Sequence, residues 1–170
     1  QLLNGIEPEV AARLVEAMST DRQADLFRKL EPEEHERFTS YLSSRTRRTI
    51  DQLLRYPPDT AGGIMTTDVL TVPSSWTVEQ VLQHLHEVGR MMETVYAIYL
   101  VDADQRLDHV VSLRELIGAE RTAPLRQIGD ARAPISVEPL TDREDVARLI
   151  SKYNLLALPV VDGERRVLGV

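Results

Sequence analysis

Apolar residues in the first third of the chain recur at helical spacing, and their pattern predicts four helices. The tripeptide Glu-Pro-Glu stands at positions 7–9 and again, 24 residues later, at 31–33. Each copy marks a helix start, because proline is tolerated in the first turn and acidic side chains suit the helix dipole there. A further helix is expected to open at residues 19–21, and a last helix is expected to cover residues 44–55. The repeat predicts a short stack of helix pairs.

Each of these helices is expected to bury one apolar face. The residues expected to share such a face are Val10, Leu14, Val15 and Met18 in the first helix and Phe38, Tyr41 and Leu42 in the third. The fourth helix presents Ile50, Leu53 and Leu54. Residues 1–55 are therefore interpreted as a small helical domain.

Residues 56–67 break the helical pattern and are interpreted as a junction between domains. Pro57 and Pro58 cannot continue a helix, and each biases the preceding residue toward extended geometry. Gly62 and Gly63 permit a sharp turn or a close approach of two backbone segments. A short β-branched run follows at once, so the domain boundary is placed here.

Beyond the junction, β-branched runs alternate with amphipathic helices, and the sequence repeats itself. The first copy has expected strands at 69–72, 96–102 and 107–111 and expected helices at 76–85 and 112–117. The second has expected strands at 135–137, 155–162 and 167–170 and an expected helix at 141–150. Asp102 and Asp162 open equivalent turns, and the helix N-caps are Thr77 in one copy and Thr141 or Asp142 in the other. A β-α-β-β-α unit cannot cover both faces of its sheet alone, so the two copies are expected to pack together.

Composition narrows the possible partners. The net charge of −7, of which −6 lies in residues 56–170, argues against nucleic acid and anionic membranes and favours cations or a basic protein face. The absence of cysteine excludes disulfides, thiolate metal ligands and thiol nucleophiles. No apolar run is long enough to span a bilayer, and no signal peptide is recognisable. A chain that begins at Gln1 is expected to be part of a longer protein.

Two pairs of acidic residues are candidate ligands for a cation. Asp21 and Asp25 lie four positions apart, so their carboxylates project from one face of a helix. Asp142 and Glu144 open the helix of the second copy, where acidic side chains also suit the helix dipole. On spacing alone, a solvated first turn and helix capping are the simpler accounts of these two pairs.

The repeated unit, with Leu158-Pro-Val-Val-Asp162 and a closing Leu168-Gly-Val, resembles the CBS domain pair. The junction, with Thr60-Ala-Gly-Gly-Ile-Met-Thr66 after short helical repeats, is similar to the cytosolic region of the MgtE-type magnesium channel family. The resemblance covers nearly the whole chain. It implies a multidomain α and α+β fold: a partial helical N domain (1–55), the junction (56–67) and a CBS pair. The two CBS domains are expected at 68–122 and 123–170, the second truncated at its C-terminal end.

The resemblance also implies a regulatory role and no enzymatic activity. It implies a homodimer through the CBS domains, attached at the cytoplasmic face of the inner membrane to a pore domain that lies outside these residues. Regulatory Mg²⁺ bound to acidic interdomain faces would favour a compact, pore-closing state. The family's acidic positions are matched here by Asp21, Asp25, Asp142 and Glu144, while Asn154 stands where the family motif has aspartate. Mg²⁺ suits such sites, because it retains several waters and is often held by only one or two carboxylates.

Two other functions stay open. Many CBS pairs bind adenine nucleotides such as ATP or AMP, and the family signature that contacts the ribose reads Ser112-Leu-Arg114-Glu115 here, with glutamate in place of aspartate. Ala97 and Leu155 offer no aromatic ring for the base. A protein-interaction scaffold built on the helical repeats would show no response to cations.

No arrangement of residues in the sequence indicates catalysis. His84 and His86 lie on different faces of their helix, without an expected carboxylate partner, and are interpreted as exposed. His109 lies alone in a strand where CBS domains usually carry glycine. Gly-rich phosphate loops, nucleophile elbows and zinc-binding pairs are missing from the sequence.

Overall fold

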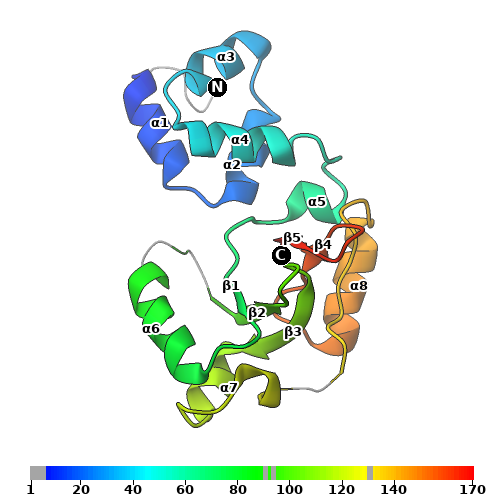
Figure 1. Cartoon of the computed structure of the whole chain (residues 1–170). Helices are drawn as coiled ribbons and strands as arrows, with labels where there is room; N and C mark the ends of the chain where they lie inside the picture. Colours follow the sequence, from blue (N-terminus) through cyan, green and yellow to red (C-terminus); the bar gives the residue numbers. More distant parts are fainter. Residues whose placement is uncertain (1–6, 90–91, 93–94, 130–131) are drawn as a thin grey trace.

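Four helices form a lobe at one end of the molecule (Figure 1). The computed structural model describes residues 7–89, 92, 95–129 and 132–170. The helices are α1 (Pro8–Glu16), α2 (Thr20–Phe27), α3 (Pro32–Thr39) and α4 (Ser44–Leu53). Helix α1 packs against α3, and α2 packs against α4. Equivalent helices of the two repeats therefore lie together, as the repeated Glu-Pro-Glu tripeptide predicts.

The lobe encloses its own apolar core. Its buried members are Ala11, Ala12, Val15, Phe27, Phe38, Leu42 and Ile50. The expected faces of α1 and α3 are wrong in part, since Val10 is 47% exposed, Leu14 53% and Tyr41 48%. Helix α1 turns its alanine side inward, because small side chains let a neighbouring helix approach closely, and its larger apolar side chains remain outside.

The junction contains one short helix, α5 (Ala61–Ile64), between the lobe and the strands (Figure 1). A Cβ atom at Gly63 would lie 2.0 Å from the carbonyl oxygen of Pro57, and one at Gly62 would lie 2.7 Å from the Tyr56 ring. The close backbone approach expected from the glycine pair is confirmed. No larger residue fits Gly63 without a backbone shift.

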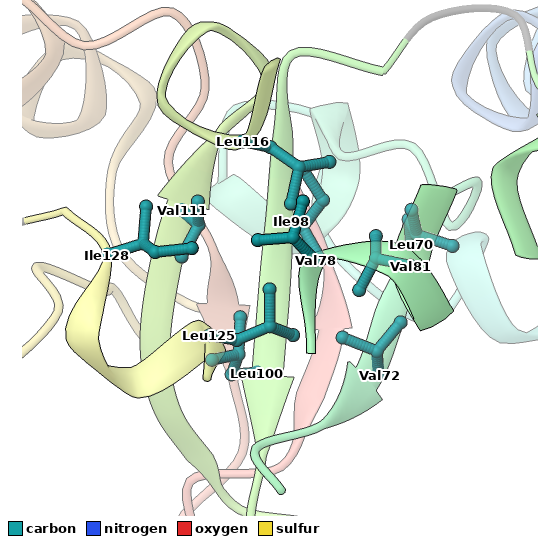
Figure 2. Packing of buried hydrophobic residues seen from close by; sticks show 10 residues of the cluster. All are labelled: Leu70, Val72, Val78, Val81, Ile98, Leu100, Val111, Leu116, Leu125 and Ile128. Atoms are coloured by element: carbon teal, nitrogen blue, oxygen red, sulfur yellow. The ribbon is translucent and has the colours of Figure 1, made fainter. Parts of the chain in front are cut away.

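The first repeated unit is a three-stranded sheet with two helices. Its elements are β1 (Thr71–Pro73), α6 (Val78–Val88), β2 (Ala97–Val101), β3 (Leu107–Ser112) and α7 (Leu113–Gly118), followed by a 3₁₀ turn at Leu125–Gln127. Strand β2 lies in the middle, parallel to β1 and antiparallel to β3. Strand β1 starts two residues later than expected. Figure 2 shows the ten buried residues that form the core of this unit, from Leu70 to Ile128.

The second unit contains α8 (Arg143–Tyr153), β4 (Val160–Val161) and β5 (Val167–Gly169). The expected strand at 135–137 is reduced to one bridge between Val137 and Val160, and the expected strand at 155–162 is reduced to β4. Asn154 ends α8 in the left-handed conformation, with φ of 50°. Asparagine tolerates this conformation better than most residues.

The two units repeat the same aspartate-led turn. The Asp102 Oδ1 atom accepts hydrogen bonds from the backbone N–H groups of Asp104 and Arg106, each at 2.9 Å. Asp162 Oδ1 does the same with the two equivalent residues, at 2.9 and 2.8 Å. The two turns also pair, since the N–H of Leu107 donates to the Arg165 carbonyl at 2.8 Å. The expected packing of the two copies is confirmed.

Candidate functional site

A largely buried arginine at the C-terminal end of α2 links the junction to the helical lobe. Arg28 Nη1 donates to Asp25 Oδ1 and to the Gly63 carbonyl, each at 2.9 Å. Its Nη2 donates to the carbonyls of Leu53, at 3.2 Å, and Tyr56, at 3.4 Å. The Arg28 side chain is only 16% exposed. Asp25 therefore supplies the counter-charge for the group that connects α2, the end of α4 and α5.

A second contact between α2 and the junction is made of hydroxyl groups. Thr20, the first residue of α2, accepts a hydrogen bond from the backbone N–H of Thr67 at 2.8 Å. Its Oγ1 also lies 3.1 Å from the Thr66 hydroxyl and 3.2 Å from the Thr67 hydroxyl. Thr20 is buried. Helix α2 is thus fixed to the junction at both of its ends.

The other side of the junction contacts the beginning of α8. The N–H groups of Ala61 and Gly62 donate to the carbonyls of Thr141 and Pro139, at 2.7 and 2.8 Å. Arg143 binds Asp59 twice, through its backbone N–H and through Nη1, each at 3.0 Å. The junction therefore lies between α2 and the N-terminal end of α8.

The four predicted cation ligands lie on these two helices. Asp21 and Asp25 are on α2, and Asp142 caps α8 by accepting a hydrogen bond from the Glu144 N–H at 2.7 Å. Within the described ranges, no three His, Asp or Glu side chains are grouped so that they would hold a metal ion together. The acidic pairs flank one junction without forming a single cluster. Such an arrangement suits a hydrated Mg²⁺ held by one or two carboxylates.

The predicted nucleotide signature has a local structural role. Ser112 caps α7 by accepting from the Glu115 N–H, and Glu115 Oε2 accepts from the Ser112 hydroxyl at 2.5 Å and from its backbone N–H at 2.9 Å. The hydroxyl bond first, and then the backbone bond, hold the pKa of Glu115 below its ordinary value. Arg114 is exposed on the same turn. The carboxylate expected to contact a ribose is thus engaged in its own helix cap.

Two histidines have surroundings that the sequence did not indicate. His84 packs edge-on against Trp76, with 5.6 Å between ring centroids, and lies 3.8 Å from the Glu87 carboxylate. The expectation of exposed histidines without a carboxylate partner is wrong for His84, which is half-buried and has Glu87 one helical turn later, while His86 is exposed as expected. His109 is buried, and its Nε2 lies 2.7 Å from the Ile128 carbonyl. It connects β3 to the segment after α7.

Two family models match the chain. The model of the MgtE intracellular N domain matches residues 1–59, and the CBS domain model matches residues 61–121 and 126–170. None of the helices in the described ranges has the length and apolar character needed to cross a bilayer.

Curated relatives are longer than this chain. The magnesium transporter MgtE of Thermus thermophilus is 41% identical over 143 residues, which are 84% of this chain and 32% of the transporter. The magnesium transporter MgtE of Bacillus subtilis is 29% identical over 169 residues, which are 99% of this chain and 37% of that protein. The chain therefore spans about a third of the length of these relatives.

Solved structures share the arrangement of domains. The soluble part of a magnesium transporter superposes with a TM-score of 0.90 at 35% identity, over 96% of this chain and 64% of that one. The cytosolic domain of the Mg²⁺ channel MgtE in complex with ATP superposes with a TM-score of 0.86 at 36% identity, over 99% of this chain and 73% of that one. The expected fold class, helices followed by a CBS pair, is confirmed. The chain belongs to the MgtE family and consists of an intracellular N domain followed by a CBS domain pair.

Proposed function

We propose that this chain is the magnesium-sensing regulatory region of a magnesium transporter. In this proposal, Mg²⁺ bound to the acidic faces beside the junction favours a compact state that closes the attached pore. One observation supports the proposal: both predicted acidic pairs lie on helices that contact the junction. Helix α2 contacts it through Arg28 and Thr20. The start of α8 contacts it through Thr141 and Arg143.

Repulsion between acidic side chains explains why a bound cation would favour docking. Asp21 and Asp25 on α2 and Asp142 and Glu144 at the start of α8 carry like charges, so they repel one another when both elements approach the junction. A divalent cation between them reduces this repulsion and adds attraction to both sides. Because the ion binds the docked state better than the separated state, docking and ion binding strengthen each other.

The remaining parts of the proposal concern the complete protein. Since the relatives named as magnesium transporters are about three times as long, we place this chain beside a membrane pore domain at the cytoplasmic face of the membrane. Pairing of two chains through their CBS domains would bring two such regions under one pore.

Limited proteolysis with trypsin tests the sensing step. Arg55 is exposed and precedes Tyr56, so cleavage after Arg55 reports the opening of the junction. Millimolar Mg²⁺ should slow this cleavage, whereas KCl at the same ionic strength should not. The variant Asp21→Asn, Asp25→Asn should lose most of the Mg²⁺-dependent protection. Asparagine retains an oxygen that accepts from Arg28, so the arginine contact survives the change.

A matched control removes the same charge elsewhere. Glu36→Ala, Glu120→Ala changes two exposed carboxylates away from the junction and should retain full protection by Mg²⁺. Equal loss of protection in both double variants would mean that Mg²⁺ acts through general screening, and the proposed site would be rejected. Absence of any Mg²⁺ effect in the unmodified chain would leave the scaffold hypothesis.

Nucleotide sensing is the second candidate, and one finding favours it: a relative that is 36% identical over 99% of this chain was solved in complex with ATP. Against it, Glu115 is engaged in its helix cap. A parallel titration with ATP distinguishes the two. Protection by ATP without Mg²⁺, weakened by Ser112→Ala with Glu115→Ala, would favour the nucleotide module, while protection by Mg²⁺ alone would favour the sensor.

A further inference from the structure

Helix α4 carries a row of basic side chains along its outer face. Arg45, Arg48 and Gln52 follow one another at intervals of three and four residues, which places them on one side of α4. Arg55 follows in the turn after the helix, where its N–H donates to the Gln52 carbonyl at 3.3 Å. All four are exposed, while Ile50 and Leu53 bury the opposite side. We call these four residues the α4 stripe. Its span of ten residues corresponds to about 15 Å.

Ion pairs one helical turn apart balance exposed charges at two other places: Asp25 pairs with Arg28 at the end of α2, and Asp145 pairs with Arg148 on α8. In the part of the chain that the structure describes, the three arginines of the stripe make no ion pair. Like charges one or two turns apart on a helix repel each other, so the stripe weakens α4 rather than supporting it. Among the described residues, Arg48 Nε donates to the Ser44 carbonyl at 3.1 Å, one turn earlier in the same helix.

One end of the stripe borders a hollow of about 460 Å³. Its wall consists of Arg48, Asp51, Gln52, Arg55 and Tyr56. The two guanidinium groups present planar sets of N–H donors, a geometry that suits bidentate binding of carboxylates. Asp51 lies in the same wall, and no ion pair joins it to either arginine in the described ranges. The hollow therefore retains a positive charge in a chain whose net charge is −7.

We infer that the α4 stripe is a docking surface for an acidic polypeptide segment that presents two or three carboxylates along about 15 Å. A narrow segment suits the stripe better than a membrane does. A flat anionic surface would also approach Asp51, in the wall of the hollow, and Glu16, which accepts a hydrogen bond from the Ser43 N–H at 2.8 Å beside the start of α4, and would be repelled by them. This inference does not depend on magnesium sensing.

A synthetic peptide tests the inference directly. The probe is a twelve-residue helical peptide with glutamates at intervals of three and four residues, and its control is the same peptide with glutamine at those positions. Isothermal titration calorimetry with the whole chain should detect the glutamate peptide but not the glutamine peptide. Binding should weaken as KCl is raised, because exposed charges are screened.

Two variants locate the contact. Arg48→Gln, Arg55→Gln should weaken binding roughly fivefold or more, the amount expected from losing two exposed ion pairs. Arg13→Gln, Arg121→Gln removes two exposed arginines elsewhere and should leave the affinity unchanged. Urea unfolding gives a second readout: the stripe variant should be as stable as the unmodified chain or slightly more stable, because repulsion on α4 is relieved.

Several results would overturn the inference. Equal binding of the glutamine peptide, or equal loss of affinity in both double variants, would show that the stripe is not the site. Absence of binding to the glutamate peptide would reject it as well. Binding to phosphatidylglycerol vesicles without binding to the peptide would assign the stripe to lipid headgroups instead. A stripe variant that unfolds more easily would show that the arginines serve the fold.

Discussion

The two CBS domains differ in the origin of their cores. The first domain builds its core from its own residues, between Leu70 and Ile128 (Figure 2). The second domain contributes only half of the buried residues of its core, Val137, Val146, Leu158 and Val160. The other half comes from the helical domain and the junction, Ala24, Leu53, Ala61 and Met65. The main core of the first domain is its own, although Tyr99 and Leu107 also pack with Val161 of the second domain. The core of the second domain is completed by the helical domain and the junction.

This difference bears on the proposed coupling between Mg²⁺ binding and domain docking. Separating the helical domain from the second CBS domain exposes apolar surface, at a cost of about 25 cal/mol for each Å². Burial therefore favours docking, and in the proposed mechanism a bound cation adds to it. The first CBS domain, whose core is independent, would stay folded during such a movement.

The largest expected effect comes from filling the close contact in the junction. Gly63→Ala places a Cβ 2.0 Å from the Pro57 carbonyl oxygen, which belongs to the backbone and cannot rotate away. We expect a loss of roughly 4 kcal/mol in the free energy of unfolding, measured with urea. Gly89→Ala is the control, because no atom of the described residues lies within 4 Å of a Cβ added there and its φ is −61°. It should leave the stability unchanged or raise it by about 0.5 kcal/mol. Equal losses in both would contradict the contact.

Truncation of one residue in each core tests the comparison itself. Leu53→Ala and Leu100→Ala each remove a fully buried leucine side chain and should each cost about 3 kcal/mol. Hydrogen exchange should then separate them. Leu53→Ala should raise exchange in α4, in the junction and near β4, whereas Leu100→Ala should raise it within residues 70–128. If both variants gave the same exchange pattern, the two cores would not be independent.

Removal of the buried arginine should loosen the junction with less effect on the cores. Arg28→Ala deletes the donor for the carbonyls of Leu53, Tyr56 and Gly63 and leaves Asp25 without its partner. We expect a loss of about 2 kcal/mol and faster tryptic cleavage after Arg55. Arg148→Ala removes an exposed ion pair with the same spacing and should change stability by less than about 0.5 kcal/mol. Unchanged cleavage in Arg28→Ala would show that the hydroxyl contacts of Thr20 suffice.

Local chemistry made much of the fold predictable. Pro8 and Pro32 mark helix starts, and Asp102 and Asp162 accept backbone hydrogen bonds in equivalent turns, because these effects act within a few residues. The inward face of α1 was not predictable in the same way. Val10, Leu14 and Val15 were expected on one face, but where α1 packs against α3 only Val15 of the three is buried.

The candidate site was predictable as a set of residues but not as an arrangement. The sequence places Asp25 and Arg28 one turn apart on a helix, yet the reach of Arg28 to the Gly63 carbonyl depends on how the chain folds back 35 residues later. The sequence did contain a sign that Glu115 caps a helix. Ser112-Leu-Arg-Glu115 has the spacing of a capping box, in which a serine is followed three residues later by a glutamate. The same four residues therefore supported a nucleotide interpretation and a structural one.

The smallest expected effect concerns this cap and depends on pH. The pKa of Glu115 is lowered in the folded state, so its stabilising effect is complete above its unfolded value, near 4.5, and is lost as the pH falls through the folded value. At pH 7, Glu115→Gln should therefore be less stable than the unmodified chain by about 1 kcal/mol or less. The difference should shrink as the pH is lowered below about 4.5, when the carboxyl group becomes protonated.

Urea unfolding at pH 7, 5 and 3.5 checks this expectation, with the exposed Glu120→Gln as the control that should show no such trend. A difference that stayed constant with pH would mean that the cap does not depend on an ionised carboxylate. Because Glu115 lies in the self-contained first CBS domain, the variant should also leave cleavage at Arg55 unchanged. Faster cleavage would show that the first CBS domain also contributes to docking. The proposed contrast between an independent core and a shared core would then be wrong.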